Sequence, residues 1–462
     1  MKRFFKISSY VLIAIMFSIA LSGCTKTTKE DPKAKQIIVW SFEDEDVWKP
    51  IVKTFATKYK GYSLIYQKQT FDSEYETRVL NSILSDQGPD VWNMPSDWVY
   101  RHKDKLVSNS KKNSEIDKYV QSLGQSVVFG DNVYALSPYE EPLMIYYNPK
   151  IFDTTLSDFN SENTGSENLE SRTETKRLLK DVPQTWTDFV ETVKLLTKTT
   201  ATGEIELSGV AMGTDKLSNS ADILYLLMLQ NETTILSNDF KQANFNLPVP
   251  TATDTTDLPG LRALEFYTSF ADPASENYAW SDSLGSDVDA FAEGKTAMIF
   301  GYSNLQNYFT QKYPIFKYKR DFVPQLTAES TKVVDYAKSN VFGVSNTTKK
   351  YVSNNANKPV ACWNLIKMLS NDSPSDSFNS ALKVYTSIKS KNDVAFDDRT
   401  TNSPDKVSLA TAKSFVKGKR PLEFDRIIKA SIASVNAGAQ DTQSALDTAA
   451  RDATDMLRKE SW

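Results

Sequence analysis

IIVWSFEDEDVWKPIVKTFATKYKGYSLIY, residues 37–66, is the stretch that decides the fold. It begins with the short apolar, β-branched run 37–40, which predicts a strand. Apolar residues then recur with helical spacing over 47–59, behind acidic residues that suit the positive end of a helix dipole. A second strand is predicted at 63–66. We therefore expect β-α-β order at the start of the ordered chain.

The same alternation continues beyond residue 66. Apolar spacing predicts a helix over 75–84, and Pro89-Asp90-Val91-Trp92 opens a further strand. Buried strands are also predicted at 297–301 and 341–344, and a mostly helical tail at 421–457. This order indicates an α/β fold with a largely parallel sheet covered by helices, in which ligands bind beyond the carboxyl ends of the strands.

The amino terminus has the layout of a secretory signal. Three basic residues among the first six precede an uncharged apolar run over 11–21, which is shorter than a membrane-spanning helix needs. Leu21-Ser22-Gly23-Cys24 resembles the bacterial lipobox, which implies a lipidated Cys24. We expect 1–23 to be a cleaved signal peptide and 24–35 a tether, which anchors the protein to the membrane on its extracytoplasmic side. An ordinary secretory signal is the alternative.

Composition narrows the classes of partner and the number of lobes. The formal net charge of −4 lacks the basic excess that nucleic-acid binding requires. About 430 residues follow the signal, more than one hydrophobic core usually serves, so two lobes are expected. Cys362, the one cysteine besides Cys24, lies on an apolar helical face, which predicts a buried structural thiol.

The sequence contains few of the residue patterns that common enzyme mechanisms require. His102 is the only histidine and lies on a polar stretch, so we expect it to be exposed, and no paired-histidine metal site can form. Gly294-Lys295-Thr296 imitates the end of a phosphate-binding loop, but Asp289 stands where a glycine is required. We expect no catalysis, no cofactor and no metal. A glycoside hydrolase, which needs only two carboxylates, is the alternative.

Six segments along the chain carry a family resemblance. They are 37–40, 88–91, 133–136 with 146–152, 183–186 with Phe189, 290–298 and 341–345. In this order they resemble the extracellular solute-binding proteins of ABC importers, specifically the sugar-binding family that includes the maltose-binding protein. The resemblance implies a type II periplasmic-binding-protein-like fold of two α/β lobes, each a mostly parallel sheet flanked by helices, with hinge crossings and a ligand cleft.

The resemblance also implies a function and a division of the chain. A monomer would capture a sugar or oligosaccharide and deliver it to ABC permease subunits, while a polyamine or peptide is the alternative ligand. The first lobe would comprise 36–140 plus about 322–384, and the second 141–321 plus about 385–462. The stretch 153–182, rich in Ser, Thr, Asn and Glu, is expected to be a polar, solvated insertion, with some helix possible near 177–179.

A sugar cleft needs carboxylates or amides for hydroxyl groups and aromatic rings for the apolar ring face. In the first lobe and at the crossing, the resemblance places ligand contacts at Glu43, Asp44, Asp97, Trp98 and either Glu141 or Glu140. Each has another interpretation. Glu43 and Asp44 can supply favourable charge at a helix start, and Asp97 can cap a helix while Trp98 lies in the core. The pair Glu140 and Glu141 can form a solvated turn.

The second lobe offers further candidates. Trp280 and the turn that contains Tyr302 and Asn304 occupy positions where relatives have aromatic and polar ligand contacts. Phe342 is placed near the hinge, although a buried strand is the simpler interpretation. No tryptophan follows 297–301, where some sugar-binding relatives have one. Tyr302 would replace that ring, so the identity of the sugar is left open.

Overall fold

The computed structural model describes residues 32–163, 169–249, 256–327, 333–353, 356–371, 373–392 and 403–459. The predicted signal peptide, Cys24 and most of the tether lie outside these ranges. Within them, none of the helices combines the length and the apolar character that a membrane crossing demands. The same ranges contain no group of side chains arranged to hold a metal ion.

The first lobe is built on a five-stranded sheet with the order β2-β1-β3-β15-β7. Its elements follow the predicted β-α-β-α-β order: β1 (Gln36–Ser41), α2 (Glu45–Lys58), β2 (Ser63–Lys68), α3 (Tyr75–Leu84) and β3 (Val91–Pro95). Strand β1 pairs in parallel with β2 and with β3. The strands β15 (Asn340–Val344) and β7 (Ala135–Leu136) add antiparallel pairings, so the sheet is mixed.

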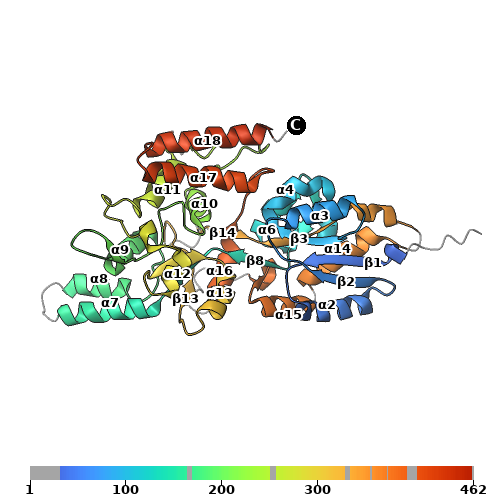
Figure 1. Cartoon of the computed structure of the whole chain (residues 1–462), viewed down its shortest axis with the longest axis horizontal. Coiled ribbons are helices and arrows are strands. Elements are labelled where there is room, and N and C mark those ends of the chain that lie inside the picture. The colour runs from blue at the N-terminus through green and yellow to red at the C-terminus, as the bar shows by residue number, and fades with distance from the viewer. Residues whose placement is uncertain are drawn as a thin grey trace, which may run out of the picture.

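Helices cover this sheet because each presents one apolar face. Trp48, Ile51 and Phe55 of α2 are buried at the spacing expected of one helical face. On α14 (Lys358–Asn371), Cys362 is a buried free thiol, as predicted. Figure 1 shows α2 and α3 on opposite sides of β1.

The second lobe contains a three-stranded sheet with the order β12-β9-β13. Its strands are β9 (Met144–Tyr147), β12 (Met298–Gly301) and β13 (Lys319–Asp321), and both outer strands run antiparallel to β9. The expectation of a mostly parallel sheet in each lobe is therefore wrong for this one. The residues of β9 and β12 are all buried, and such uninterrupted apolar runs carry no signal for strand direction.

Long helices form most of the second lobe. They are α9 (Trp186–Leu196), α10 (Ser220–Gln230), α11 (Pro259–Ser269), α17 (Pro421–Asn436) and α18 (Thr442–Lys459). Phe189, Leu224, Ile428 and Leu446 are fully buried in their shared core. The predicted helical tail is thus confirmed, and α17 and α18 lie side by side along the top of the lobe in Figure 1.

The stretch 153–182 is more ordered than a solvated insertion. It contains most of α7 (Pro149–Glu162) and, after residues outside the description, α8 (Leu169–Leu178). Phe152 and Leu179 at its two ends are buried in the core of the second lobe. Few positions of these helices face that core, so a composition rich in Ser, Thr and Asn conceals the helical period.

Three crossings join the lobes and meet in one four-stranded sheet of order β16-β8-β14-β17. Its strands are β8 (Tyr139–Pro142), β14 (Asp335–Lys338), β16 (Tyr385–Thr386) and β17 (Ala412–Lys413). β8 and β14 pair antiparallel, so Lys338 lies opposite Glu141. Figure 1 shows β8 and β14 between the two lobes.

The packing of the cores marks where the chain crosses. Val323 and Tyr336 pack in the core of the second lobe, whereas Leu409 and Ala412 pack in that of the first. The second crossing therefore falls near residue 336 and the third near residue 412. The expected boundaries at about 322 and 384 precede these positions.

Candidate functional site: the cavity between the lobes

A cavity of about 610 Å³ lies between the lobes, and we call it the interlobe cavity. Both lobes and the crossings line it. The lining residues used below are Phe71, Asp97, Glu141, Tyr302, Asn304, Tyr336, Lys338, Phe415, Lys417 and Asp425. Ligand sites in proteins commonly have a volume of this order and are lined by apolar surface with a few convergent polar groups.

Asp97 supplies a carboxylate from the first lobe. It follows the carboxyl end of β3 in the short 3-10 helix Ser96–Trp98, which is the edge where ligands of α/β sheets bind. Within the part of the chain that the structure describes, its Oδ1 atom is buried without a hydrogen-bond partner. Burial raises the pKa of Asp97, against the opposing charge of Lys417. A buried acceptor of this kind is positioned to receive a hydrogen bond from a ligand.

Glu141 supplies a second carboxylate from the first crossing. Ser303 donates a hydrogen bond to it, and Lys338 stands opposite it across the two strands. Burial raises the pKa of Glu141, while Ser303 and Lys338 counteract this rise. Glu141 thus lies at the junction of both lobes, where residues of each interact with it.

The neighbouring Glu140 faces the opposite side of the same strand, as successive strand residues do. It accepts hydrogen bonds from Ser122 Oγ at 3.0 Å and Ser339 Oγ at 2.8 Å. Burial raises the pKa of Glu140 to about 7. Of the two residues left open by the sequence, only Glu141 lines the interlobe cavity.

Two lysines at the cavity are already paired with carboxylates. Lys338 Nζ lies 2.7 Å from Asp222 Oδ2, and Lys417 Nζ lies 2.8 Å from Asp425 Oδ1 and 4.0 Å from Asp222 Oδ1. Burial acts to raise the pKa of Asp222, but the two lysines outweigh it and the pKa is lowered. With both lysines paired in this way, Asp97 and Glu141 are the carboxylates available to a ligand.

Aromatic rings provide the apolar surface of the cavity. Phe71 is 52% exposed and packs against Phe42 and Trp98, with ring centroids 5.1 Å and 5.9 Å away. On the second lobe, the hydroxyl of Tyr302 donates to Asp222 Oδ2 at 2.9 Å, and Lys338 Nζ lies 4.1 Å above the Tyr302 ring. Rings from both lobes can therefore pack on the apolar face of a ligand whose hydroxyl groups reach the carboxylates.

The structure brings four of the sequence-predicted site residues together at the interlobe cavity: Asp97, Glu141, Tyr302 and Asn304. Three others belong to the first lobe and do not line the cavity. Glu43 is buried and accepts from Trp48 Nε1 at 3.0 Å, while Asp44 is exposed and pairs with Lys68 at 2.6 Å. The ring of Trp98 packs against that of Phe71, which lines the cavity.

Trp280 and Phe342 occupy hydrophobic cores, which corrects their expected place at the ligand site. Trp280 is fully buried among the apolar residues of the second lobe. Phe342 is fully buried in β15, where its ring packs edge-on against Trp48 at 5.8 Å. The apolar run of β15 gives no sign of which face of the sheet Phe342 will occupy, and Trp280 lies outside any strand, in a polar stretch that gives no sign of its burial.

Several residues of the cavity escaped the sequence analysis. Phe71, Lys338, Phe415 and Lys417 are contributed by a loop and by two crossings that lie far apart in the chain. Asp222, which pairs with both cavity lysines, could have been recognised from the sequence, because it is the single charged residue in the otherwise apolar helix α10. A charge in such a helix requires a partner in the fold.

The structure also bears on the single histidine. His102 is 4% exposed, which corrects the expectation of an exposed residue, and its Nε2 lies 2.7 Å from Glu76 Oε1. Its neighbours are the rings of Trp92 and Trp98. This arrangement gives His102 a structural contact inside the first lobe.

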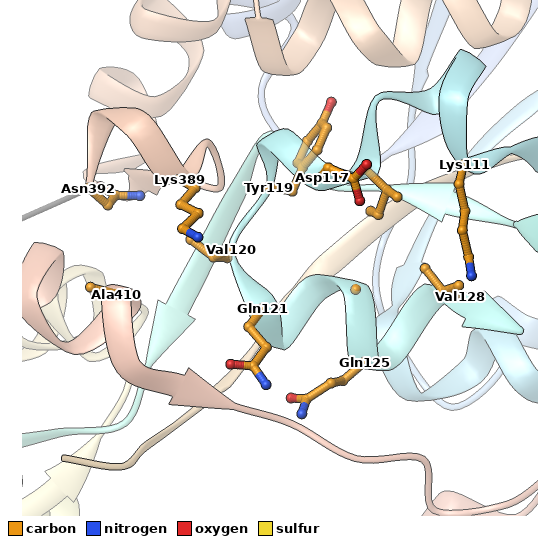
Figure 2. Close-up of a pocket in the computed structure, with 12 residues that line it drawn as sticks. Lys111, Asp117, Tyr119, Val120, Gln121, Gln125, Val128, Lys389, Asn392 and Ala410 are labelled. Carbon is orange, nitrogen blue, oxygen red and sulfur yellow. The ribbon is translucent and has the colours of Figure 1, made fainter. Parts of the chain in front are cut away.

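A second cavity, of about 590 Å³, lies in the first lobe, and we call it the first-lobe cavity. Figure 2 shows Lys111 and Lys389 on opposite sides of it, with Gln121 and Gln125 of α6 (Gln121–Val127) between them. Asp117 is its one lining carboxylate. Residues of the second lobe do not line it, so closure of the lobes cannot enclose a ligand there.

Two lobes, three crossings and a polar, aromatic cavity between the lobes define a two-lobed solute-binding protein. Residues 50–404 match the family described as bacterial extracellular solute-binding protein. The chain belongs to this family, which places it outside the cytoplasm. No curated protein matches the chain in sequence.

Solved structures of similar fold include three ligand-binding proteins. The cyclic α-maltosyl-1,6-maltose binding protein of Arthrobacter globiformis is 15% identical, with a TM-score of 0.69 over 92% of this chain and 99% of that chain. The sugar-binding protein MalE of Xanthomonas citri is 14% identical, with a TM-score of 0.67 over 92% and 98%. A Listeria monocytogenes substrate-binding protein in complex with cycloalternan is 16% identical, with a TM-score of 0.60 over 91% and 98%.

Proposed function

We propose that this chain captures a sugar or oligosaccharide between its lobes and delivers it unaltered to the permease of an ABC importer. The observation that carries the proposal is the interlobe cavity, in which Asp97 and Glu141 face aromatic rings of both lobes. The three similar proteins bind cyclic α-maltosyl-1,6-maltose, a sugar and cycloalternan, which supports the same class of ligand here. A monomer is sufficient for this binding, because one chain contributes both walls of the cavity.

The carboxylates favour a ligand rich in hydroxyl groups. Lys338 and Lys417 are paired with Asp222 and Asp425, so the carboxylates of Asp97 and Glu141 are not taken up by an ion pair with either lysine. Hydroxyl donors can satisfy them, and ring faces of the sugar can pack on Phe71 and Tyr302.

The first test is a calorimetric screen of the protein against neutral mono- and oligosaccharides, polyamines and peptides. Saturable sugar binding, with the sugar recovered unchanged by chromatography, is the expected result. Cleavage of the sugar would identify a glycoside hydrolase, and binding of a polyamine or peptide alone would reject the sugar proposal.

Asp97→Ala is expected to weaken binding of the best sugar about tenfold, the loss of one charge-assisted hydrogen bond. Asp117→Ala, which removes the carboxylate of the first-lobe cavity, is the matched control and should leave the dissociation constant unchanged. Equal affinities of the wild type and the Asp97→Ala variant would remove Asp97 from the site.

We further propose that lipid on Cys24 holds the mature chain at the membrane. The supporting observation is the Leu21-Ser22-Gly23-Cys24 sequence after an apolar signal. Cys24→Ser is expected to move the protein from the membrane fraction to the soluble fraction of cells that express it. Retention of this variant in the membrane fraction would reject the anchor.

A further inference from the structure

A finger of the second lobe, residues 236–243, reaches the first lobe away from the three crossings. Its base is an antiparallel bridge between Leu236 and Ala243. Ala243 is buried in the core of the second lobe, and its backbone N–H donates to Thr454 Oγ1 of α18 at 3.1 Å. The finger is therefore fixed to the second lobe.

Hydrogen bonds also hold the finger rigid along its length. The Ser237 N–H donates to the Gln242 carbonyl at 2.9 Å, and the Phe240 N–H donates to the Ser237 carbonyl at 2.9 Å. The hydroxyl of Ser237 binds Asp239 Oδ1 at 2.7 Å and accepts from the Gln242 N–H at 3.0 Å. These bonds leave Phe240 little freedom at the tip.

The ring of Phe240 contacts two aromatic residues of the first lobe. Its centroid lies 5.4 Å from that of Tyr100 in α4 (Val99–His102) and 6.4 Å from that of Phe129 in β5 (Val128–Phe129), both edge to face. Tyr100 and Phe129 pack on each other at 5.1 Å, and Lys103 Nζ lies 4.2 Å from the Tyr100 ring centroid. Phe240 thus fits an aromatic receptor that the first lobe builds by itself.

Phe240 adopts a backbone conformation that is unfavourable for a phenylalanine. Its φ of +57° is left-handed, a conformation that a bulky side chain rarely adopts and that glycine adopts freely. Nothing inside the finger requires a phenylalanine there. The contact that uses this side chain is the one with the first lobe, and such strain often marks a functional position.

The receptor is linked to the proposed ligand site. Tyr100 follows Asp97 by three residues in the turn that continues from Ser96–Trp98 into α4. The Phe240 contact therefore holds the Asp97 segment at a set position relative to the second lobe, which contributes Tyr302 and Asn304 to the interlobe cavity.

We propose that Phe240 is a positioning residue for ligand binding: it docks on Tyr100 and Phe129, holds the lobes in the arrangement seen here, and thereby raises the affinity of the interlobe cavity. The part that concerns affinity rests on the proposed function. When the binding-competent arrangement is only partly populated, the apparent dissociation constant rises in proportion.

Interlobe distance provides a test that needs no ligand. Spin labels at Lys53→Cys of α2 and Asp153→Cys of α7 report on the two lobes, in a Cys24→Ser background with Cys362 buried. Pulsed electron paramagnetic resonance then compares wild-type Phe240 with Phe240→Ala. We expect a broader distance distribution for the variant, with a population absent from the wild type. Identical distributions would overturn the proposal.

Two further variants separate docking from folding. Phe240→Gly keeps the left-handed backbone favourable, so it is expected to melt near the wild-type temperature while it broadens the distribution. Tyr59→Ala is the matched control, because Tyr59 packs on Phe55 at 4.8 Å within one lobe, with Lys58 5.8 Å from its ring centroid. An equal broadening by Tyr59→Ala would overturn the assignment to Phe240.

Calorimetry with maltotetraose tests the consequence for affinity. Phe240→Ala and Phe240→Gly are expected to weaken binding about two- to tenfold, as the loss of one aromatic contact implies. Unchanged affinity despite a broadened distribution would refute the link to binding. Absence of maltotetraose binding by the wild type would count against the proposed ligand class, while the distance measurement still decides the docking role.

Discussion

The interlobe cavity and the first-lobe cavity have nearly equal volumes, about 610 and 590 Å³, but different chemistry. Asp97, Glu141 and Asp425 line the first, and two lysines are already paired beside them. The first-lobe cavity has Asp117 as its one carboxylate, and its walls belong to one lobe. Size therefore does not identify the site. The site is identified by the carboxylates and aromatic rings that both lobes contribute to the interlobe cavity.

The largest expected difference between the two cavities is the contribution of their lysines to the free energy of unfolding. Lys417 is 5% exposed and paired with Asp425 and Asp222, whereas Lys389 is exposed. Lys417→Met leaves buried carboxylates unpaired and should lower the free energy of unfolding by about 3 to 5 kcal/mol. Lys389→Met should change it by less than about 0.5 kcal/mol. Urea unfolding checks both, and equal effects would contradict the difference in burial.

The second-largest expected effect is on stability and distinguishes Glu140 from Glu141, which lie on opposite faces of β8. Glu140 keeps its proton up to a pKa of about 7 in the folded state, against an ordinary value of 4.5, because it is buried. Folding therefore takes up a proton between these pH values, and stability falls as pH rises through them. Glu140→Gln should exceed the wild type in stability at about pH 8 by at most about 3 kcal/mol and match it at about pH 4.

Glu141→Gln is the companion variant on the cavity face. It should weaken ligand binding about tenfold by removing a charged acceptor, whereas Glu140→Gln should leave affinity unchanged. Unfolding curves over pH and calorimetry measure the two effects. The assignment of faces would be wrong if Glu140→Gln alone reduced affinity.

The smallest expected effect concerns the exposed ring of the cavity. Phe71→Ala should weaken binding about fivefold, the equivalent of about 1 kcal/mol for an aromatic contact. Its stability should change little, since the ring is half exposed. Val128→Ala in the first-lobe cavity is the control and should not alter affinity. A stronger effect of Val128→Ala on calorimetric affinity would point to the wrong cavity.

Elements with a clear period could be predicted from the sequence. The strands and helices between residues 36 and 95 follow their apolar spacing, and α17 and α18 follow theirs. Within 153–182 the sequence indicated helix only near 177–179, where α8 ends, because α7 buries too few positions to show a period. The antiparallel direction of β12 and β13 also had no local signal.

The candidate site shows the same division. Asp97 and Glu141, which both line the interlobe cavity, were expected there from the family resemblance, which left Glu140 open as the alternative to Glu141. Lys338, Phe415 and Lys417 reach the cavity through crossings whose strands pair with segments far away in the chain. Trp280 and Phe342 share the residue type of a ligand contact, but packing assigns them to cores.

The sequence by itself determined the order of strands and helices, the need for two lobes and the supply of carboxylates and rings. Only the tertiary structure decided which of them meet, because the faces of a strand and the pairing of distant segments depend on long-range packing. That packing turned Glu141 to the interlobe cavity and Glu140 away from it, paired both cavity lysines, and placed Phe240 of one lobe against Tyr100 of the other.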